Sequence, residues 1–193
     1  MARPKAFDQE TVLSKAMEVF WEKGYEATSM QDLVAAMGIH RGSLYDTFQD
    51  KRHLFLAAIA YYNTTVTKAA IAPLQAPGAS RSVIEQHIIA FAEQAATDPH
   101  RRGCLMTNSI IELATQDPEV AIALRRSLRS VEDAFYRALG RAQDNGEISP
   151  DKDIRALAQY LTSSLQGLRV MSKVNPDREA LRQTAQLILQ VLD

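Results

Sequence analysis

The sequence predicts an all-α protein, in which a small N-terminal three-helix head precedes a larger helical body, about nine helices in total. Apolar residues recur at three- and four-residue spacing along most of the chain, which is typical of amphipathic helices. No segment alternates convincingly enough to be a strand, and Gly- and Pro-containing turns separate the helical segments. We place the head at residues 1–52 and the body at residues 53–193.

Composition limits the class of protein. With 193 residues, 46% of them hydrophobic and 23% charged, the chain can bury a substantial core. It carries no apolar leader or membrane-spanning run, and its single cysteine excludes an intrachain disulfide, so we expect a cytoplasmic protein without a membrane partner. The four histidines lack metal-site spacing and there is no glycine-rich phosphate loop, so we expect neither metal nor cofactor.

The first two helices of the head follow from apolar spacing and capping residues. Residues 7–23 predict a helix with Leu13, Ala16, Met17 and Phe20 facing inward. Thr28 and Ser29 are candidate N-caps for a second helix, and Gly38 is a candidate C-cap. Asp32 lies three residues after Ser29, where a negative charge favours a helix N-terminus.

The third helix, residues 40–48, is short and has two different faces. Leu44 and Phe48 lie four residues apart on the inner face. The other face carries polar and small residues, namely Arg41, Gly42, Ser43, Tyr45 and Thr47. Asp50 is a candidate cap for the following helix, whose first turn contains Lys51 and Arg52.

These residue types suit a helix that enters the DNA major groove. Arg41 can pair with guanine or phosphate, and Gly42 allows a close approach to the DNA backbone. Ser43 and Thr47 can bond bases or phosphates, while Tyr45 and Lys51 suit phosphate contacts. For any one of these residues, a solvated polar face on an ordinary three-helix unit remains an equal alternative. The head is not basic overall, so its attraction for DNA must be local, from Arg3, Lys5, Arg41, Lys51 and Arg52.

The stretch GYEATSMQDLVAAMGIHRGSLYDTFQDKRHL, residues 24–54, resembles the TetR-type (TetR/AcrR) transcriptional repressors. The matching positions are Gly24, Tyr25, Thr28, Leu33, Ala36, Gly38, Ile39, Gly42, Leu44, Tyr45, Phe48, Lys51 and Leu54. The resemblance implies phosphate contacts from Thr28, Tyr45 and Lys51, and groove contacts from Arg41, Gly42 and Ser43. Thr47 departs from the aromatic or His that is usual in the family. The complete expected DNA-binding set is Thr28, Ser29, Arg41, Gly42, Ser43, Tyr45, Thr47 and Lys51.

The body divides at its turns. A helix from Lys51 carries Phe55, Ile59, Tyr62 and Val66 on one stripe, and residues 72–80 end it. Further helices are expected around residues 84–95, from about 103 to 115, and from Asp117-Pro118 to the turn NGEISPD. Two more follow, separated by Asn175-Pro176.

The last two helices are the expected homodimer surface. Ser163, Ser164 and Gly167 place small residues on adjoining faces of the penultimate helix, which allows another helix to approach closely. The QGLRV string resembles the region where TetR-like subunits meet in a four-helix bundle. For either helix alone, packing within one subunit is the alternative.

Between head and dimer helices we expect a cavity for a small-molecule effector. Candidate lining residues are Phe91, Met106, Ile110, Leu113, Leu128 and Tyr136, although for each taken singly an ordinary core position is the favoured interpretation. An apolar or aromatic compound is the default ligand for such a lining.

Cys104 is a candidate sensor. It follows Arg101, Arg102 and Gly103 at an expected helix N-terminus, where cations and the helix dipole favour thiolate. Its GCL string resembles a TetR subgroup with members that sense electrophiles or oxidants through this thiol. The alternative is a half-buried packing residue.

Together these features favour a ligand-responsive transcriptional regulator, a repressor by the family's commoner habit, that binds a palindromic double-stranded DNA operator as a homodimer. The effector or modification of the thiol would release it from DNA. An enzyme is disfavoured, because no nucleophile, base and orienting residue occur at recognisable spacing. A helical ligand-binding carrier or adaptor without DNA binding is the alternative.

Overall fold

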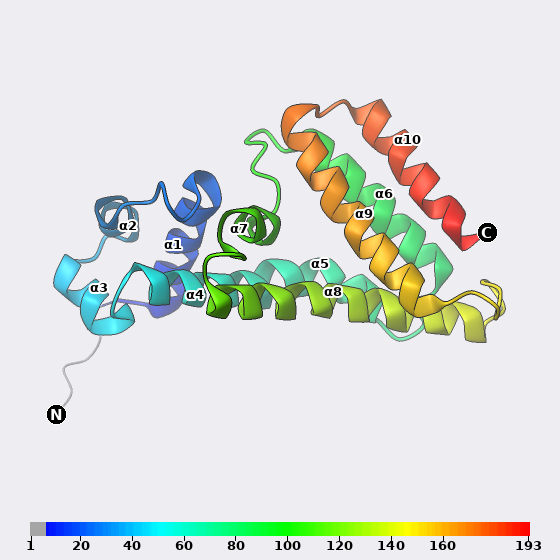
Figure 1. Ribbon diagram of the computed structural model, residues 1–193, viewed down its shortest axis with the longest axis horizontal. Helices are drawn as coiled ribbons and strands as arrows, with labels where there is room; N and C mark the ends of the chain where they lie inside the picture. Colours follow the sequence, from blue (N-terminus) through cyan, green and yellow to red (C-terminus); the bar gives the residue numbers. More distant parts are fainter. Residues whose placement is uncertain (1–6) are drawn as a thin grey trace.

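The computed structural model describes residues 7–193 (Figure 1), so Arg3 and Lys5, which we expected to attract DNA, lie outside it. The helices are α1 (Gln9–Lys23), α2 (Met30–Met37), α3 (Arg41–Phe48), α4 (Lys51–Tyr62), the π-helical segment η1 (Asn63–Thr67), α5 (Lys68–Gln75), α6 (Arg81–Thr97), α7 (Leu105–Leu113), α8 (Pro118–Asp144), α9 (Ile154–Val174), α10 (Arg178–Leu189) and the 3-10 turn η2 (Gln190–Leu192). Since α4, η1 and α5 are continuous and η2 directly follows α10, the described chain forms nine helical units and no strand. The all-α prediction is confirmed.

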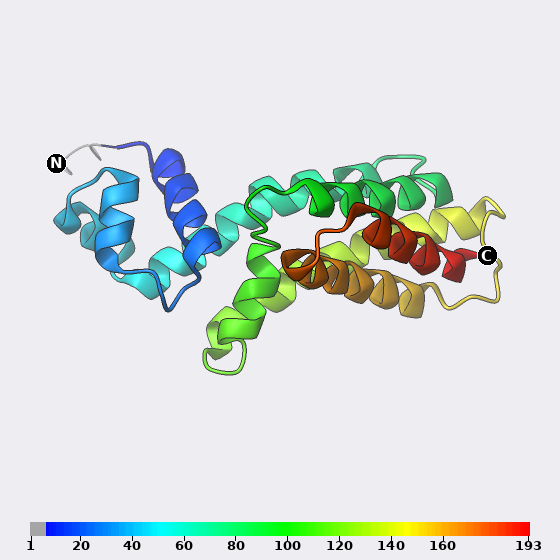
Figure 2. The ribbon, with the colours of Figure 1, turned by 90° about the horizontal axis from the view of Figure 1, so that it is seen from above.

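The helix starts of the head are fixed by side-chain caps. Asp8 caps α1, which therefore begins at Gln9 rather than at the predicted Phe7. Ser29 and Asp32 form a reciprocal capping box at α2, and Asp50 accepts a hydrogen bond from the backbone N–H of His53 at 2.8 Å. Gly38, in the left-handed conformation at φ 68°, ends α2. These caps place α3 close after α2, at one end of the molecule (Figure 2).

The core of the head continues into the body. Leu33, Leu44 and Phe20 pack with residues of α4 as far as Tyr62. The same cluster includes Cys104, Leu105 and Met106 at the start of α7, and Val120 and Leu124 of α8. The predicted boundary after residue 52 falls in the first turn of α4, whereas the packing of the head extends well beyond it.

The helix that joins head to body is longer than predicted. It runs through Pro73 to Gln75, although we expected residues 72–80 to end it. Its centre is π-helical, and the hydroxyls of Thr64 and Thr65 donate to the carbonyl of Tyr61 in the preceding turn, at 3.0 and 2.8 Å. Such π-helical turns often occur at functional sites.

The body has its own core, formed mainly by α5, α6, α8, α9 and α10. Figure 1 shows α5 and α8 along the long axis of the molecule, with α6, α9 and α10 together at the end away from the head. The helix α8 contributes to both cores, with Leu124 near its start and Phe135 and Leu139 further along. Within the described residues, no helix has the length and apolar character needed to cross a membrane.

Candidate DNA-binding surface and ligand cavity

The helix α3 separates its buried and exposed residues as predicted. Leu44 and Phe48 are buried, whereas Arg41, Gly42 and Tyr45 are exposed and Ser43 and Thr47 are half-buried. The guanidinium of Arg41 donates to the Tyr45 hydroxyl at 3.4 Å and lies 5.6 Å from the centre of its ring. Arg41 and Tyr45 therefore present one polar surface from adjacent turns of α3.

Thr28 occupies a different position from the one expected. Its side chain is 1% exposed, and its hydroxyl donates to the carbonyl of Gly24 at 2.5 Å. The hydroxyl is thus held inside the head, and we correct the expectation that it contacts phosphate. Ser29 is exposed, but its hydroxyl is engaged with Asp32 in the capping box.

Lys51 joins the start of α4 to the turn that precedes α2. Its ammonium group donates to the carbonyls of Tyr25 and Thr28, at 2.9 and 3.0 Å, and lies 4.3 Å from the centre of the Tyr25 ring. Two of its three N–H donors are therefore used within the protein. A third remains for an external acceptor.

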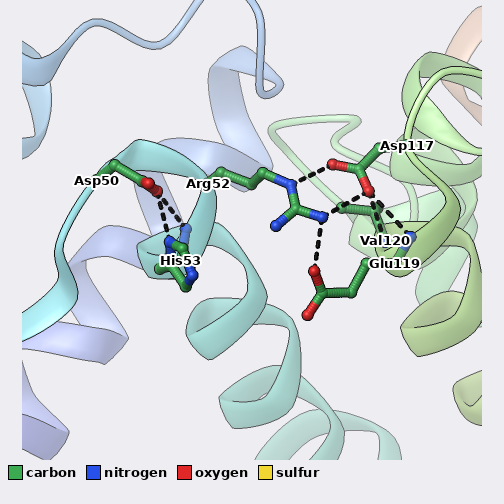
Figure 3. A network of polar contacts seen from close by, with 6 residues as sticks. All are labelled: Asp50, Arg52, His53, Asp117, Glu119 and Val120. Carbon is green, nitrogen blue, oxygen red and sulfur yellow. Dashed lines mark hydrogen bonds and ion pairs between the residues drawn. The ribbon is translucent and has the colours of Figure 1, made fainter.

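Arg52 is bound to the body instead of being free for DNA (Figure 3). Its guanidinium donates to Asp117 at 2.5 and 2.9 Å and to Glu119 at 2.7 Å. These hydrogen bonds hold the pKa of Asp117 far below its usual value. Arg52 thus links the first turn of α4 to the N-terminus of α8. Its charge is neutralised there, so it adds little to the local field that we predicted for the head.

A cavity of about 620 Å³ lies in the body beside the π-helical segment. Three of the six predicted lining residues, Phe91, Met106 and Leu128, line it, and so does the sensor candidate Cys104. Further apolar walls come from Val66, Ile71, Val131 and Leu165, so α4–α5, α6, α7, α8 and α9 all contribute.

Ile110 and Tyr136 do not line this cavity, and neither does Leu113. Ile110 and Leu113 pack instead in the core that the head shares with the start of α8. Tyr136 packs against the body core, with the guanidinium of Arg155 3.9 Å from the centre of its ring. The structure therefore does not place these three residues at this cavity, because apolar spacing identifies an inner face without showing which core it joins.

The polar residues of the cavity were missed by sequence reasoning. Tyr62, His87 and Arg169 all line it. Burial is the main cause that raises the pKa of Tyr62, and it also lowers the pKa of His87 to about 4, helped by the charge of Arg169. One of these residues could have been found from the sequence. Arg169, in the QGLRV string, places a charge beside the apolar stripe of α9 and so could have indicated a polar group in the cavity.

Cys104 is the N-terminal boundary residue of α7, 7% exposed, with its Sγ 3.7 Å from the Tyr62 hydroxyl. The neighbouring Arg102 is directed elsewhere, since it pairs with Glu18 and its guanidinium lies 4.2 Å from the centre of the Trp21 ring. The cationic environment that we expected from Arg102 is therefore not provided. Cys104 instead lies against the cavity and a buried tyrosine.

A short exposed recognition helix, held by two capped neighbours on a helical body, defines a helix-turn-helix DNA-binding protein. Residues 12–58 match the family described as bacterial regulatory proteins, tetR family, and residues 82–188 match the tetracyclin repressor-like C-terminal domain. The chain belongs to the TetR family of transcriptional regulators.

Individual relatives agree with this assignment. The chain is 44% identical to the uncharacterized HTH-type transcriptional regulator YezE of Bacillus subtilis over 100% of both chains. It is 32% identical to the HTH-type transcriptional repressor ComR of Escherichia coli, over 98% of this chain and 90% of ComR. A cysteine mutant of the TetR family regulator CifR, complexed with 26-bp operator DNA, superposes with a TM-score of 0.87 at 29% identity, covering 99% of this chain and 100% of that one. These relatives confirm a regulator rather than an enzyme.

Proposed function

We propose that the protein is a repressor that binds a palindromic operator as a homodimer and releases it when a small molecule occupies the cavity. The observation that carries this proposal is that the cavity and the DNA-reading head share walls. Tyr62 and Cys104 line the cavity and also belong to the core of the head. The relative ComR is named as a repressor, which supports repression rather than activation.

The DNA surface is centred on the N-terminal half of α3. Arg41, Gly42 and Tyr45 are exposed, and Arg41 makes no ion pair within the described chain. Ser43 and Thr47, both half-buried, lie at the edge of this surface. We assign base or phosphate contacts to Arg41 and phosphate contacts to Tyr45 and the remaining donor of Lys51. The CifR mutant solved with operator DNA supports this use of the head.

The dimer surface is an exposed apolar face of α9 and α10. Large apolar side chains are unusually exposed there, with Tyr160 at 45%, Met171 at 60%, Val174 at 83% and Leu187 at 63%. Gly167 and Ser163 lie on the same face of α9 and are also exposed, which allows close approach of a partner helix. A second copy fits this face best, because a two-fold dimer presents two α3 helices to successive turns of DNA.

Three contacts can carry a change at the cavity to the head. The indole of Trp21 donates to the carbonyl of Gly103 at 3.2 Å and packs edge-on against the ring of Tyr62 at 5.1 Å. The carboxylate of Glu112, on α7, accepts the backbone N–H groups of Tyr25 and Glu26, at 2.9 and 2.8 Å, just before α2.

The third contact is the Arg52–Asp117–Glu119 network, which ties α4 to α8 (Figure 3). A ligand that moves α7 or α8 would thus shift α2 and α4, and with them α3. Release from DNA requires that the ligand bind more tightly to the conformation that does not fit the operator.

An electrophoretic mobility shift with DNA from upstream of the protein's own gene tests the DNA-binding part. We expect the wild type to shift this DNA at low salt and less at moderate salt. Arg41→Ala should weaken binding by about tenfold or more, while Arg137→Ala, which removes an exposed arginine from α8, should bind like the wild type. Equal binding by the wild type and Arg41→Ala would remove α3 as the reading helix.

Thiol modification is a second candidate signal, favoured by the position of Cys104 on the cavity wall beside Tyr62. An electrophile small enough to enter the cavity would form a bond to Sγ, whose S–H proton passes to solvent, and would displace the Tyr62 hydroxyl. Because Cys104 is the sole cysteine, Cys104→Ser leaves no other thiol. Loss of operator release by N-ethylmaleimide in this variant supports the idea, and unchanged release in the variant contradicts it.

A further inference from the structure

The cavity contains one permanent charge. Of the side chains that line it, all within the described part of the chain, only Arg169 is an ionised residue at neutral pH. No carboxylate lines the cavity, and the remaining polar groups there are hydroxyls, amides, the Cys104 thiol and the neutral imidazole of His87. A buried or half-buried cation is costly unless something neutralises it.

Arg169 has no neutralising partner within the described residues. Its guanidinium lies over the Phe91 ring, 4.3 Å from the ring centre, and this aromatic contact does not neutralise the charge. Its N–H donors lie in the plane of the guanidinium and form no ion pair with an acid of the described chain. The nearby Glu93, on the same helix as Phe91, is paired with Arg178 at 2.5 Å. The Tyr62 hydroxyl, which also lines the cavity, interacts with the guanidinium but carries no charge, so the positive charge of Arg169 is left for a ligand to neutralise.

The adjoining hollow does not supply the missing charge. This second cavity, of about 570 Å³, shares Tyr62, Phe91 and Arg169 with the first and adds Asp98 and Arg102. Asp98 already accepts the backbone N–H groups of His100 and Arg102, both at 3.0 Å, and Arg102 pairs with Glu18. Both added charges are therefore engaged elsewhere.

From this arrangement we infer that the effector is an amphiphilic anion, whose carboxylate, sulfonate or similar group binds Arg169 and whose apolar part fills the cavity. A planar oxyanion matches the parallel donors of a guanidinium. The apolar part would contact Leu128, Val131 and Leu165, which lie on the neighbouring helices α8 and α9. The inference rests on the proposed function, since it names the ligand class for the same cavity. It also changes the expectation of a purely apolar or aromatic compound.

Two fluorescent dyes test it, because 1-anilinonaphthalene-8-sulfonate and N-phenyl-1-naphthylamine share one aromatic skeleton and differ by the sulfonate. We expect the wild type to bind the sulfonate at least about tenfold more tightly. Arg169→Gln should lose this preference while it keeps its affinity for the neutral dye, which shows that the cavity is intact. The matched control Arg137→Gln removes an exposed arginine outside the cavity and should retain the preference.

The rate of Cys104 alkylation tests whether the dye binds in this cavity, because a dye bound there would shield the thiol. In the reaction with N-ethylmaleimide, Sγ bonds to one alkene carbon and solvent supplies the proton to the other, so mass spectrometry counts the product. The sulfonate should slow this alkylation in the wild type and leave its rate in Arg169→Gln nearly unchanged. Equal affinity of the wild type for both dyes would overturn the inference, as would a sulfonate preference that survives in Arg169→Gln.

Operator binding by the same preparations separates the two proposals. If the wild type binds operator DNA but does not prefer the anion, the ligand class is wrong and the regulator stands. If it binds the anion through Arg169 but no DNA, the proposed function fails.

Discussion

Thr28 and Lys51 show, at the scale of single residues, how a residue type expected at a DNA surface can be used inside the head. The Thr28 hydroxyl donates a hydrogen bond to the Gly24 carbonyl, and the Lys51 ammonium donates two hydrogen bonds to carbonyls of the same turn. Gly24 itself adopts φ 82°, and a Cβ there would come within 3.1 Å of the Glu112 carboxylate. The turn before α2 is therefore held tightly from several sides.

We predict that Thr28→Val destabilises the protein without weakening DNA contacts directly. The substitution keeps the shape but leaves the Gly24 carbonyl without its donor, so the free energy of unfolding should fall by about 1–2 kcal/mol. Urea unfolding measures this loss. Operator affinity, measured well below the unfolding transition, should change less than about threefold. A large loss of affinity at unchanged stability would restore Thr28 as a phosphate contact.

Protonation of His87 should make the stability of the folded protein depend on pH under acidic conditions. Its pKa in the folded protein is about 4, below its ordinary value of 6.5, because burial and the nearby Arg169 disfavour the protonated ring. Above pH 6.5 the ring is neutral in both folded and unfolded states, so it causes no pH dependence. As the pH falls from 6.5 towards 4, only the unfolded state gains the proton, and the free energy of unfolding falls by about 1.4 kcal/mol per pH unit.

Urea unfolding at pH 7 and pH 5 tests this response in the wild type and in His87→Gln. The variant should lose less stability on acidification than the wild type, because it has no ring to protonate. Identical losses would show that His87 is not buried as described.

At the scale of elements, the N-terminus of α8 combines a cap with a link to the head. Asp117 accepts the backbone N–H groups of Glu119 and Val120, at 3.0 and 3.1 Å, and also binds Arg52. Asparagine caps helices well but carries no charge. Asp117→Asn therefore removes the ion pair and retains the cap, whereas Asp117→Ala removes both.

We predict that Asp117→Ala lowers the free energy of unfolding by about 2 kcal/mol, and that Asp117→Asn recovers more than half of this loss. The ion pair contributes the smaller part because both side chains are partly exposed. Thermal unfolding of the three proteins measures the difference. Equal stability of the Asn and Ala variants would mean that the ion pair, not the cap, dominates.

The sequence predicted most elements because their ends carry side-chain caps that act locally. Ser29, Asp50 and Asp117 each begin a helix where expected. The continuation through Pro73 and the π-helical turn at Asn63–Thr67 were not predictable, because packing along the whole α4–α5 helix overrides local propensity there. The cavity was predictable in part. Its apolar walls follow helical spacing, while Tyr62, His87 and Arg169 meet only when three helices distant in the sequence, α4, α6 and α9, pack together.

At the scale of the whole molecule, one exposed face should determine assembly. We predict that Val170→Glu combined with Val174→Glu converts the proposed homodimer into a monomer, because two charges from each protomer would be buried against its partner. Light scattering after gel filtration measures the mass. Ile122→Glu, which places a charge on an exposed apolar site of α8, is the control and should remain dimeric. A monomeric wild type at micromolar concentration would contradict the proposed interface.

Dimerisation and DNA binding are expected to act together, so that two copies of α3, one from each protomer, bind one operator. The most direct measurement is the mass of the complex formed with a duplex from upstream of the protein's own gene, by sedimentation velocity, for the wild type and for Arg41→Ala/Tyr45→Ala. We expect an even number of protomers, at least one pair, on each duplex for the wild type and no complex for the double variant, which should itself remain a folded dimer. A single protomer per duplex, or a complex that forms equally well with the double variant, would contradict it.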